Sequence, residues 1–162
     1  MQSTCKIAAP NLTPVGWFEC DLFSVSKSGY WTEHEIKLTV ADFKADVMKE
    51  NLYRIDGVFR PVKKHDMLTA RNEQGPSYFW YVLSTDVARQ VEVPEWAGLK
   101  IVAPSVNYRG LNFNVMKQAP RLHKAKASEK MIDQVKVSLY WRYWRMRLHK
   151  ENPLKEPEDD HG

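Results

Sequence analysis

Cysteine is scarce in this chain, with only Cys5 and Cys20 among 162 residues. The two residues form no Cys-x-x-Cys motif and belong to no His cluster suited to zinc, which argues against a disulfide scaffold and a zinc-bound fold. The chain must therefore be stabilised by an ordinary hydrophobic core, and its length suits a single domain. We expect Cys20 to pack as a small apolar residue.

Long hydrophobic runs are also missing. No stretch approaches the roughly 20 apolar residues of a membrane-spanning helix. Residues 1–17 lack the charged start and the apolar run of about 7–15 residues that a secretory signal needs. We therefore expect a cytoplasmic protein, located in the bacterial host cell if a phage encodes it.

The net charge of +4 is modest, but it is unevenly distributed. Residues 121–150 hold nine Lys and Arg against two acids, whereas residues 151–162 hold five acids and one Lys. We interpret residues 1–150 as the domain and residues 151–162 as an acidic, flexible tail. A basic block of this kind either binds a polyanion or is simply a solvated helix face.

Two aromatic and β-branched segments, 17–25 and 30–40, predict a β-hairpin. A three-residue loop ending at Gly29 supplies the left-handed conformation that such loops prefer, and it places Asp21 opposite Glu35. Because strand side chains alternate, one face then bears charged residues, namely Glu19, Asp21, Glu33, Glu35 and Lys37. The other face is expected in the core and bears Phe18, Cys20, Leu22, His34, Ile36 and Leu38.

The charged face of this hairpin is the candidate site. Four neighbouring carboxylates disfavour full ionisation unless cations are present, and a divalent metal would supply the charge. Asp21 and Glu35 are the expected ligands of Mg²⁺ or Mn²⁺, with Glu19 and Glu33 in support. Lys37 would orient a water molecule or neutralise phosphoryl oxygens. The alternative is a hairpin whose outer face is exposed to water.

The remaining pattern alternates strands and helices and predicts an α/β fold. Thr39 can cap a helix over residues 39–52, and residues 56–75 are mainly a loop with a short helix near 65–70. The apolar run 78–84 predicts a central strand, and residues 99–103 and 111–115 predict two more.

Residues 128–150 have the periodicity of a long helix. We expect its apolar stripe to hold it to the domain, through Val137, Tyr140, Trp141, Trp144 and Leu148. A flank of basic residues would then contact nucleic-acid phosphates, namely Lys136, Arg142, Arg145 and His149. Lys63 and Lys64 are a second candidate for this contact. The aromatic side chains of the helix would also suit a homodimer contact.

Asp21 followed after thirteen residues by Glu35-Ile36-Lys37 resembles the core of the PD-(D/E)xK nuclease superfamily. Cys20 stands where the motif has its Pro, and no N-terminal helix supplies the further acid of many relatives. Together with the segments 75–84 and 91–102, the hairpin is similar to small phage and bacterial nuclease-like proteins related to MmcB-like DNA-repair proteins. The similarity covers roughly residues 17–126.

This resemblance implies a restriction-endonuclease-like core with a mixed sheet flanked by helices. It also implies a Mg²⁺- or Mn²⁺-dependent endonuclease that hydrolyses DNA, with Asp21, Glu35 and Lys37 as its catalytic residues. Two alternatives stay open. One is a fold that binds nucleic acid or protein without cutting, and the other is an anti-defence protein whose basic helix contacts a host partner.

Overall fold

The centre of the computed structural model is a six-stranded mixed sheet in the order β1-β2-β3-β6-β7-β8. The structure describes residues 5–105 and 110–151, the last three without their side chains. Strands β3, β6 and β7 run parallel, and the other neighbours pair antiparallel. The α/β expectation is therefore confirmed. The strands are β1 (Cys5–Leu12), β2 (Cys20–Ser26), β3 (Trp31–Lys37), β6 (Tyr78–Ser84), β7 (Gly98–Pro104) and β8 (Leu111–Lys117).

The β2–β3 hairpin has the predicted register. Leu22 pairs with His34 and Phe23 with Glu33, which is the pairing that places Asp21 opposite Glu35. Gly29 has φ +90°, and its N–H donates to the Ser26 carbonyl at 3.0 Å. The left-handed glycine and the three-residue loop therefore fix which residues of the two strands face one another.

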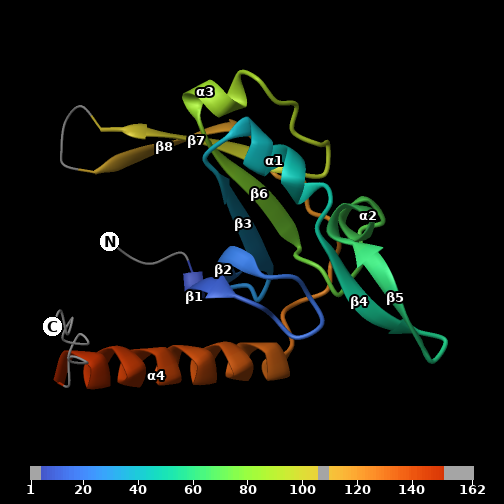
Figure 1. Ribbon diagram of the computed structural model, residues 1–162, viewed down its shortest axis with the longest axis vertical. Helices are drawn as coiled ribbons and strands as arrows, with labels where there is room; N and C mark the ends of the chain where they lie inside the picture. The colour runs from blue at the N-terminus through green and yellow to red at the C-terminus, as the bar shows by residue number, and fades with distance from the viewer. Residues whose placement is uncertain (1–4, 106–109, 152–162) are drawn as a thin grey trace, which may run out of the picture.

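The segment between β3 and β6 carries two helices and a second, two-stranded sheet. It comprises α1 (Val40–Asp46), β4 (Glu50–Ile55), β5 (Val58–Lys63) and α2 (Lys64–Thr69). Thr39 caps α1 as expected by accepting from the Asp42 N–H at 3.0 Å, but α1 is shorter than predicted because β4 begins at Glu50. The β4–β5 hairpin projects from one end of the molecule, opposite the β7–β8 arm (Figure 1).

Phe18 and Cys20 are buried as expected, but the charged residues of β3 are buried as well, which contradicts the sequence prediction. Glu33, Glu35 and Lys37 are buried, whereas Ile36 is 44% and Leu38 73% exposed. Charges can be buried here because cations from α2 and from the turn between α1 and β4 pair with the carboxylates. The apolar pattern could not reveal these partners.

His34 lies on the opposite, open face of the sheet and is only partly buried, so it is not the core histidine that we expected. Its ring stacks on Trp80, and Lys100 Nζ donates to its Nε2 at 2.8 Å. Burial and the neighbouring Lys100 lower the pKa of His34 to about 4, so its ring is neutral at physiological pH.

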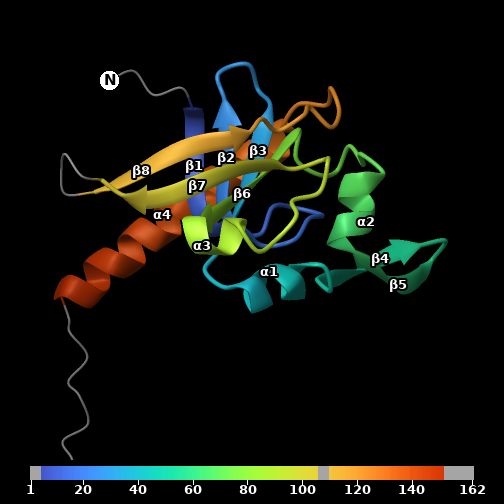
Figure 2. The ribbon, with the colours of Figure 1, turned by 90° about the horizontal axis from the view of Figure 1, so that it is seen from above.

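Helix α3 (Thr85–Ala88) follows β6, and the long helix α4 (Glu129–Glu151) closes the described chain. Figure 2, seen from above, shows α1, α2 and α3 along one side of the main sheet, with α4 passing β1 and extending beyond the domain. Among the described residues, no helix is both long enough and apolar enough to cross a membrane.

The stripe that we expected to hold α4 to the domain is exposed instead, including Val137, Trp141 and Trp144. Contact with the domain is made by the neighbouring line of residues. Met131 and Val135 belong to the hydrophobic core, and Leu139 packs against it. The helix carries apolar side chains on two faces, so periodicity alone did not identify the packed one.

Candidate active site

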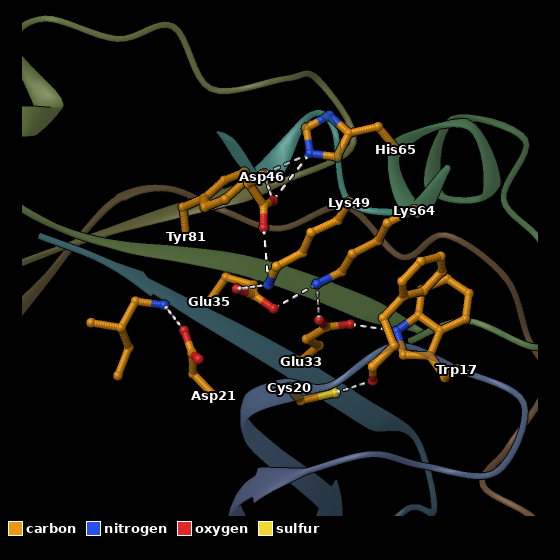
Figure 3. A network of polar contacts seen from close by, with 12 residues as sticks. Trp17, Cys20, Asp21, Glu33, Glu35, Asp46, Lys49, Lys64, His65 and Tyr81 are labelled. Atoms are coloured by element: carbon orange, nitrogen blue, oxygen red, sulfur yellow. Dashed lines mark hydrogen bonds and ion pairs between the residues drawn. The ribbon is translucent and has the colours of Figure 1, made fainter. Parts of the chain in front are cut away.

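Asp21 lies on β2, directly beside the Glu35-Ile36-Lys37 segment of β3. Its Oδ2 accepts a hydrogen bond from the Ile36 N–H at 2.7 Å (Figure 3). Burial raises the pKa of Asp21, and the Ile36 hydrogen bond opposes this rise; the charges of Glu35, Lys37 and Lys49 also act on it. The hairpin thus brings Asp21, Glu35 and Lys37 together, as the sequence predicted.

Glu35 is fully buried, and lysines surround its carboxylate. Lys37 Nζ lies 2.8 Å and Lys49 Nζ 3.1 Å from its Oε2, and Lys64 Nζ lies 2.5 Å from its Oε1. Burial alone raises the pKa of Glu35, but attraction to Lys64 and hydrogen bonds from Lys37 and Lys64 lower it to about 2. The carboxylate is therefore ionised at neutral pH.

Lys37 is held between two carboxylates, because its Nζ also lies 3.2 Å from Asp46 Oδ1. Burial tends to lower the pKa of Lys37, but Glu35 and Asp46 outweigh it and the net shift is upward. Lys37 therefore stays protonated at neutral pH. Such a group can neutralise developing negative charge but is a poor general base.

Lys64 occupies the deepest part of the site, where it forms ion pairs with Glu33 and Glu35. Glu33 also accepts a hydrogen bond from the Trp17 indole N–H at 2.7 Å. Burial raises the pKa of Glu33 to about 7 despite Lys64, with Glu35 adding to the rise. Burial alone lowers the pKa of Lys64, but Glu33 and Glu35 raise it above its usual range.

Asp46, at the end of α1, is a member of the site that sequence reasoning missed. It accepts hydrogen bonds from the Tyr81 hydroxyl at 2.7 Å and contacts His65 Nε2 at 3.1 Å (Figure 3). Burial raises its pKa, but His65, Lys64 and Tyr81 together hold the pKa of Asp46 well below its usual range. Asp46 thus provides a second permanent negative charge beside Lys37.

A signal for Asp46 was present in the sequence. It stands three residues after Phe43, and both are the buried residues of α1. A charged residue on the apolar face of a short helix indicates a buried ionic partner. Tyr81 carried no comparable signal, because a tyrosine in an apolar strand usually packs in the core.

Lys49 forms the most accessible part of the cluster. Its ammonium bridges Glu35 Oε2 at 3.1 Å and Asp46 Oδ1 at 3.3 Å, and 38% of its side chain is exposed. The other two lysines are nearly or fully buried. Lys49 is therefore the lysine of this cluster that solvent reaches most readily.

The supporting acids that we predicted lie in different places. Glu33 is inside the cluster, but Glu19 precedes β2 and is exposed. Lys64 was expected to contact nucleic acid, which its complete burial and two ion pairs prevent. Its neighbour Lys63 is only partly buried at the end of β5.

The basic residues proposed for α4 also differ from one another. Arg145 is exposed, and Lys136 is exposed with an ion pair to Asp133 at 2.8 Å. The Arg142 guanidinium donates to the carbonyls of Pro10 and Asn11, so it attaches α4 to β1. The side chain of His149 lies outside the described part of the chain, and so does most of the predicted acidic tail.

The implied divalent metal would need oxygen ligands from the carboxylates of this site. In residues 5–105 and 110–151, no group of three or more His, Cys, Asp or Glu side chains is arranged as a metal site. Asp21 and Glu35 are nevertheless adjacent hard-oxygen donors, and magnesium needs only one or two carboxylates. The donor types therefore fit the metal, but Lys37, Lys49 and Lys64 already pair with both oxygens of Glu35.

Comparisons with known proteins give a fold relationship but no function. No protein-family model matches the chain, and no curated protein matches it. Among solved structures, it resembles the SPO1766 protein of unknown function from Silicibacter pomeroyi, with a TM-score of 0.53 at 13% identity. The match covers 95% of this chain and 85% of the other. The two proteins therefore share a fold.

Proposed function

We propose that this protein is a Mg²⁺- or Mn²⁺-dependent nuclease that hydrolyses DNA phosphodiester bonds. The observation that carries the proposal is the contact between Asp21 and the Glu35-Ile36-Lys37 segment, at 2.7 Å to the central N–H. One carboxylate of β2 lies there beside a segment of β3 that carries an acid and a lysine, and metal-assisted hydrolysis needs these groups near one another.

The connectivity around β3 supports a PD-(D/E)xK relationship. β3 pairs antiparallel with the strand that bears Asp21, and parallel with β6, which follows after α1 and the inserted segment. This is the order that the sequence resemblance implies for a restriction-endonuclease-like core. The β4–β5 hairpin and α2 are an addition to that order.

In this proposal Asp21 and Glu35 hold the metal. A bound divalent cation would polarise the phosphodiester and lower the pKa of a bound water molecule. Lys37, kept protonated by Glu35 and Asp46, stabilises the negative charge that gathers on the phosphoryl oxygens. Asp46 positions Lys37, and Tyr81 and His65 in turn fix Asp46.

The experiment is a panel of labelled DNA and RNA substrates incubated with Mg²⁺, Mn²⁺ or a chelator. Asp21→Asn should abolish metal-dependent cleavage while the fold is preserved, since an asparagine oxygen can still accept from Ile36. Glu92→Gln, at an exposed position, is the matched control and should cut normally. Cleavage by Asp21→Asn at the wild-type rate would refute the site.

A non-cutting module that binds nucleic acid or protein is the second candidate, and one observation favours it. Lys37, Lys49 and Lys64 already neutralise Glu33, Glu35 and Asp46, so the carboxylates are paired without a metal. Calorimetric titration separates the two proposals. A nuclease should bind Mn²⁺ and lose that binding in Asp21→Asn, whereas a non-cutting module should show no metal binding.

A further inference from the structure

The open face of the main sheet carries a hollow of about 340 Å³, which we call the sheet hollow. Its volume lies in the range of small-molecule sites. Four strands supply its apolar lining, which consists of Leu22, Ile36, Val82, Phe113 and Val115. The polar members of the lining are His34 and Lys100. The hollow lies on the side of β3 opposite the carboxylate cluster, because Ile36 projects away from Glu35 and Lys37.

Two rows of paired residues build the sheet hollow. One row crosses β3, β6, β7 and β8, and its members are Ile36, Val82, Lys100 and Val115. The neighbouring row crosses β2, β3 and β6, and its members are Leu22, His34 and Trp80. Paired residues project from the same face of a sheet, so the backbone register gathers these side chains around one space.

Lys100 is the cation of the sheet hollow, and its ammonium contacts two neutral rings. Its Nζ donates to His34 Nε2 at 2.8 Å and lies 4.3 Å from the centroid of Trp80. Among the described residues, Lys100 takes part in no ion pair. Burial lowers the pKa of Lys100, and Cys5 acts in the opposite direction. The ammonium has therefore lost water without gaining a carboxylate partner.

His34 leaves the charge of Lys100 unbalanced. Burial and Lys100 itself lower the pKa of His34 to about 4, so the ring is a neutral acceptor at pH 7. An ammonium has several N–H groups, and His34 accepts from one of them. A ligand with a negative charge can therefore bind Lys100 without displacing His34.

The apolar lining also favours a ligand. Ile36, Phe113 and Val115 are between 44% and 58% exposed, although they stand beside one another on the same face. Covering them removes apolar surface from water, which is favourable in proportion to the area covered. A ligand for this place therefore needs an apolar body as well as a negative charge.

We propose that the sheet hollow binds a small organic monocarboxylate, with the carboxylate paired to Lys100 and the apolar body against the strand side chains. A single ammonium in an otherwise uncharged lining balances one negative charge, whereas a phosphate dianion would bring a second, unbalanced charge. A nucleic-acid backbone is charged along its whole length, which an apolar lining does not match. This inference does not rest on the proposed function, because the carboxylate cluster lies on the other face of the sheet.

Isothermal titration calorimetry at pH 7 tests the proposal with naphthalene-2-carboxylate as the probe. The wild-type chain should bind it at one site with a Kd below about 1 mM. Naphthalene-2-carboxamide has the same rings without the charge, and it should bind at least about 10-fold more weakly. Equal affinity for the two compounds would overturn the role of Lys100.

Lys100→Met isolates the ammonium, because methionine keeps an apolar side chain of similar length. Affinity for the carboxylate should fall at least about 10-fold, whereas affinity for the carboxamide should change less than about 3-fold. Lys130→Met, at an exposed position of α4, is the matched control and should bind both compounds as the wild type does. An unchanged carboxylate affinity in Lys100→Met would contradict the proposal.

Val115→Trp tests the hollow itself by filling it. Both compounds should lose their binding, and circular dichroism should show a preserved fold because Val115 is 48% exposed. Val58→Trp, at an exposed apolar position on β5, is the control and should bind normally. Binding that persists in Val115→Trp would place the ligand elsewhere on the molecule and refute the site.

Two further outcomes would also overturn the proposal. One is the absence of binding by the wild-type chain at about 5 mM of either compound, which is weaker than a specific site of this size should be. The other is displacement of naphthalene-2-carboxylate by a short duplex DNA, which would assign Lys100 to a phosphate backbone. Neither outcome would affect the nuclease proposal, whose tests depend on Asp21.

Discussion

The carboxylate of Asp21 accepts a hydrogen bond from the Ile36 N–H, which fastens the start of β2 to the residue between Glu35 and Lys37. Because the donor is a backbone N–H, the position of Asp21 relative to the Glu35-Ile36-Lys37 segment is set by a side-chain-to-backbone contact. Asp21→Asn can therefore remove the charge and leave the geometry in place. Most other changes at the site would also disturb the buried ion pairs.

Divalent metal should stabilise the folded protein, because only the folded state brings Asp21 and Glu35 together. At ten times the dissociation constant of Mn²⁺, we expect the Tm to rise by roughly 3–6 °C. Asp21→Asn should blunt the rise. Lys49→Ala should enlarge it by removing the ammonium that competes for Glu35, whereas Lys44→Ala on the exposed side of α1 should not. Differential scanning fluorimetry measures all four proteins.

Lys64→Ala should be strongly destabilising, since it leaves Glu33 and Glu35 buried with less positive charge beside them. We expect a loss of about 3–5 kcal/mol in the free energy of unfolding, measured by urea denaturation. Lys63→Ala is the control and should cost less than about 1 kcal/mol, as is usual for a residue outside the core. Equal losses in the two variants would contradict the ion pairs of Lys64.

Stability should fall as the pH rises from about 4.5 to about 7, because the folded pKa of Glu33 is raised to about 7. A carboxyl with a raised folded pKa binds its proton more tightly in the folded state than in the unfolded state. Its stabilising contribution is therefore complete below the unfolded pKa and is lost as the pH rises to the folded pKa. The slope is at most ~1.4 kcal/mol per pH unit for one proton. Glu33→Gln should remove it in urea denaturations at stepped pH.

The opposite dependence is expected at acid pH. The folded pKa of Glu35 is lowered to about 2, so its stabilising contribution is present above its unfolded pKa and is lost as the pH falls toward 2. Asp46, whose pKa is also lowered, acts in the same direction. A stability that kept rising below pH 4 would contradict both ion-pair assignments.

Arg145 and Arg142 should affect DNA binding differently. Arg145→Ala should flatten the log–log dependence of affinity on salt by roughly 0.9 if the exposed side chain neutralises one phosphate. Arg142→Ala should leave that slope unchanged but lower the Tm, because its guanidinium is engaged with the carbonyls of Pro10 and Asn11. Fluorescence anisotropy with labelled duplex at several salt concentrations measures the slopes.

Local sequence rules predicted the elements whose determinants are local. Gly29 set the hairpin register, Thr39 capped α1, and the apolar run of β6 identified a central strand. The β4–β5 hairpin was also predictable but was missed. Asp56-Gly57 is a strong two-residue turn signal, and both residues have positive φ as such turns require.

The identity of the buried face could not be predicted from the hairpin alone. Burial of Glu35 depends on Lys49 and Lys64, which stand 14 and 29 residues away along the chain. The apolar residues Ile36 and Leu38 led us to predict that their face is buried, because hydrophobicity scales treat a charge as if it had no partner. The second apolar face of α4 misled the prediction in a similar way.

The segment between β3 and β6 affects how the chain folds. Lys64 begins α2, immediately after the β4–β5 hairpin, yet its ammonium sits between the two glutamates of β3. Glu33 and Glu35 cannot lose their hydration at acceptable free-energy cost until this cation arrives. Burial of the sheet interior is therefore coupled to docking of the segment that carries Lys64, and the β4–β5 hairpin should order in the same cooperative step as β3 and β6.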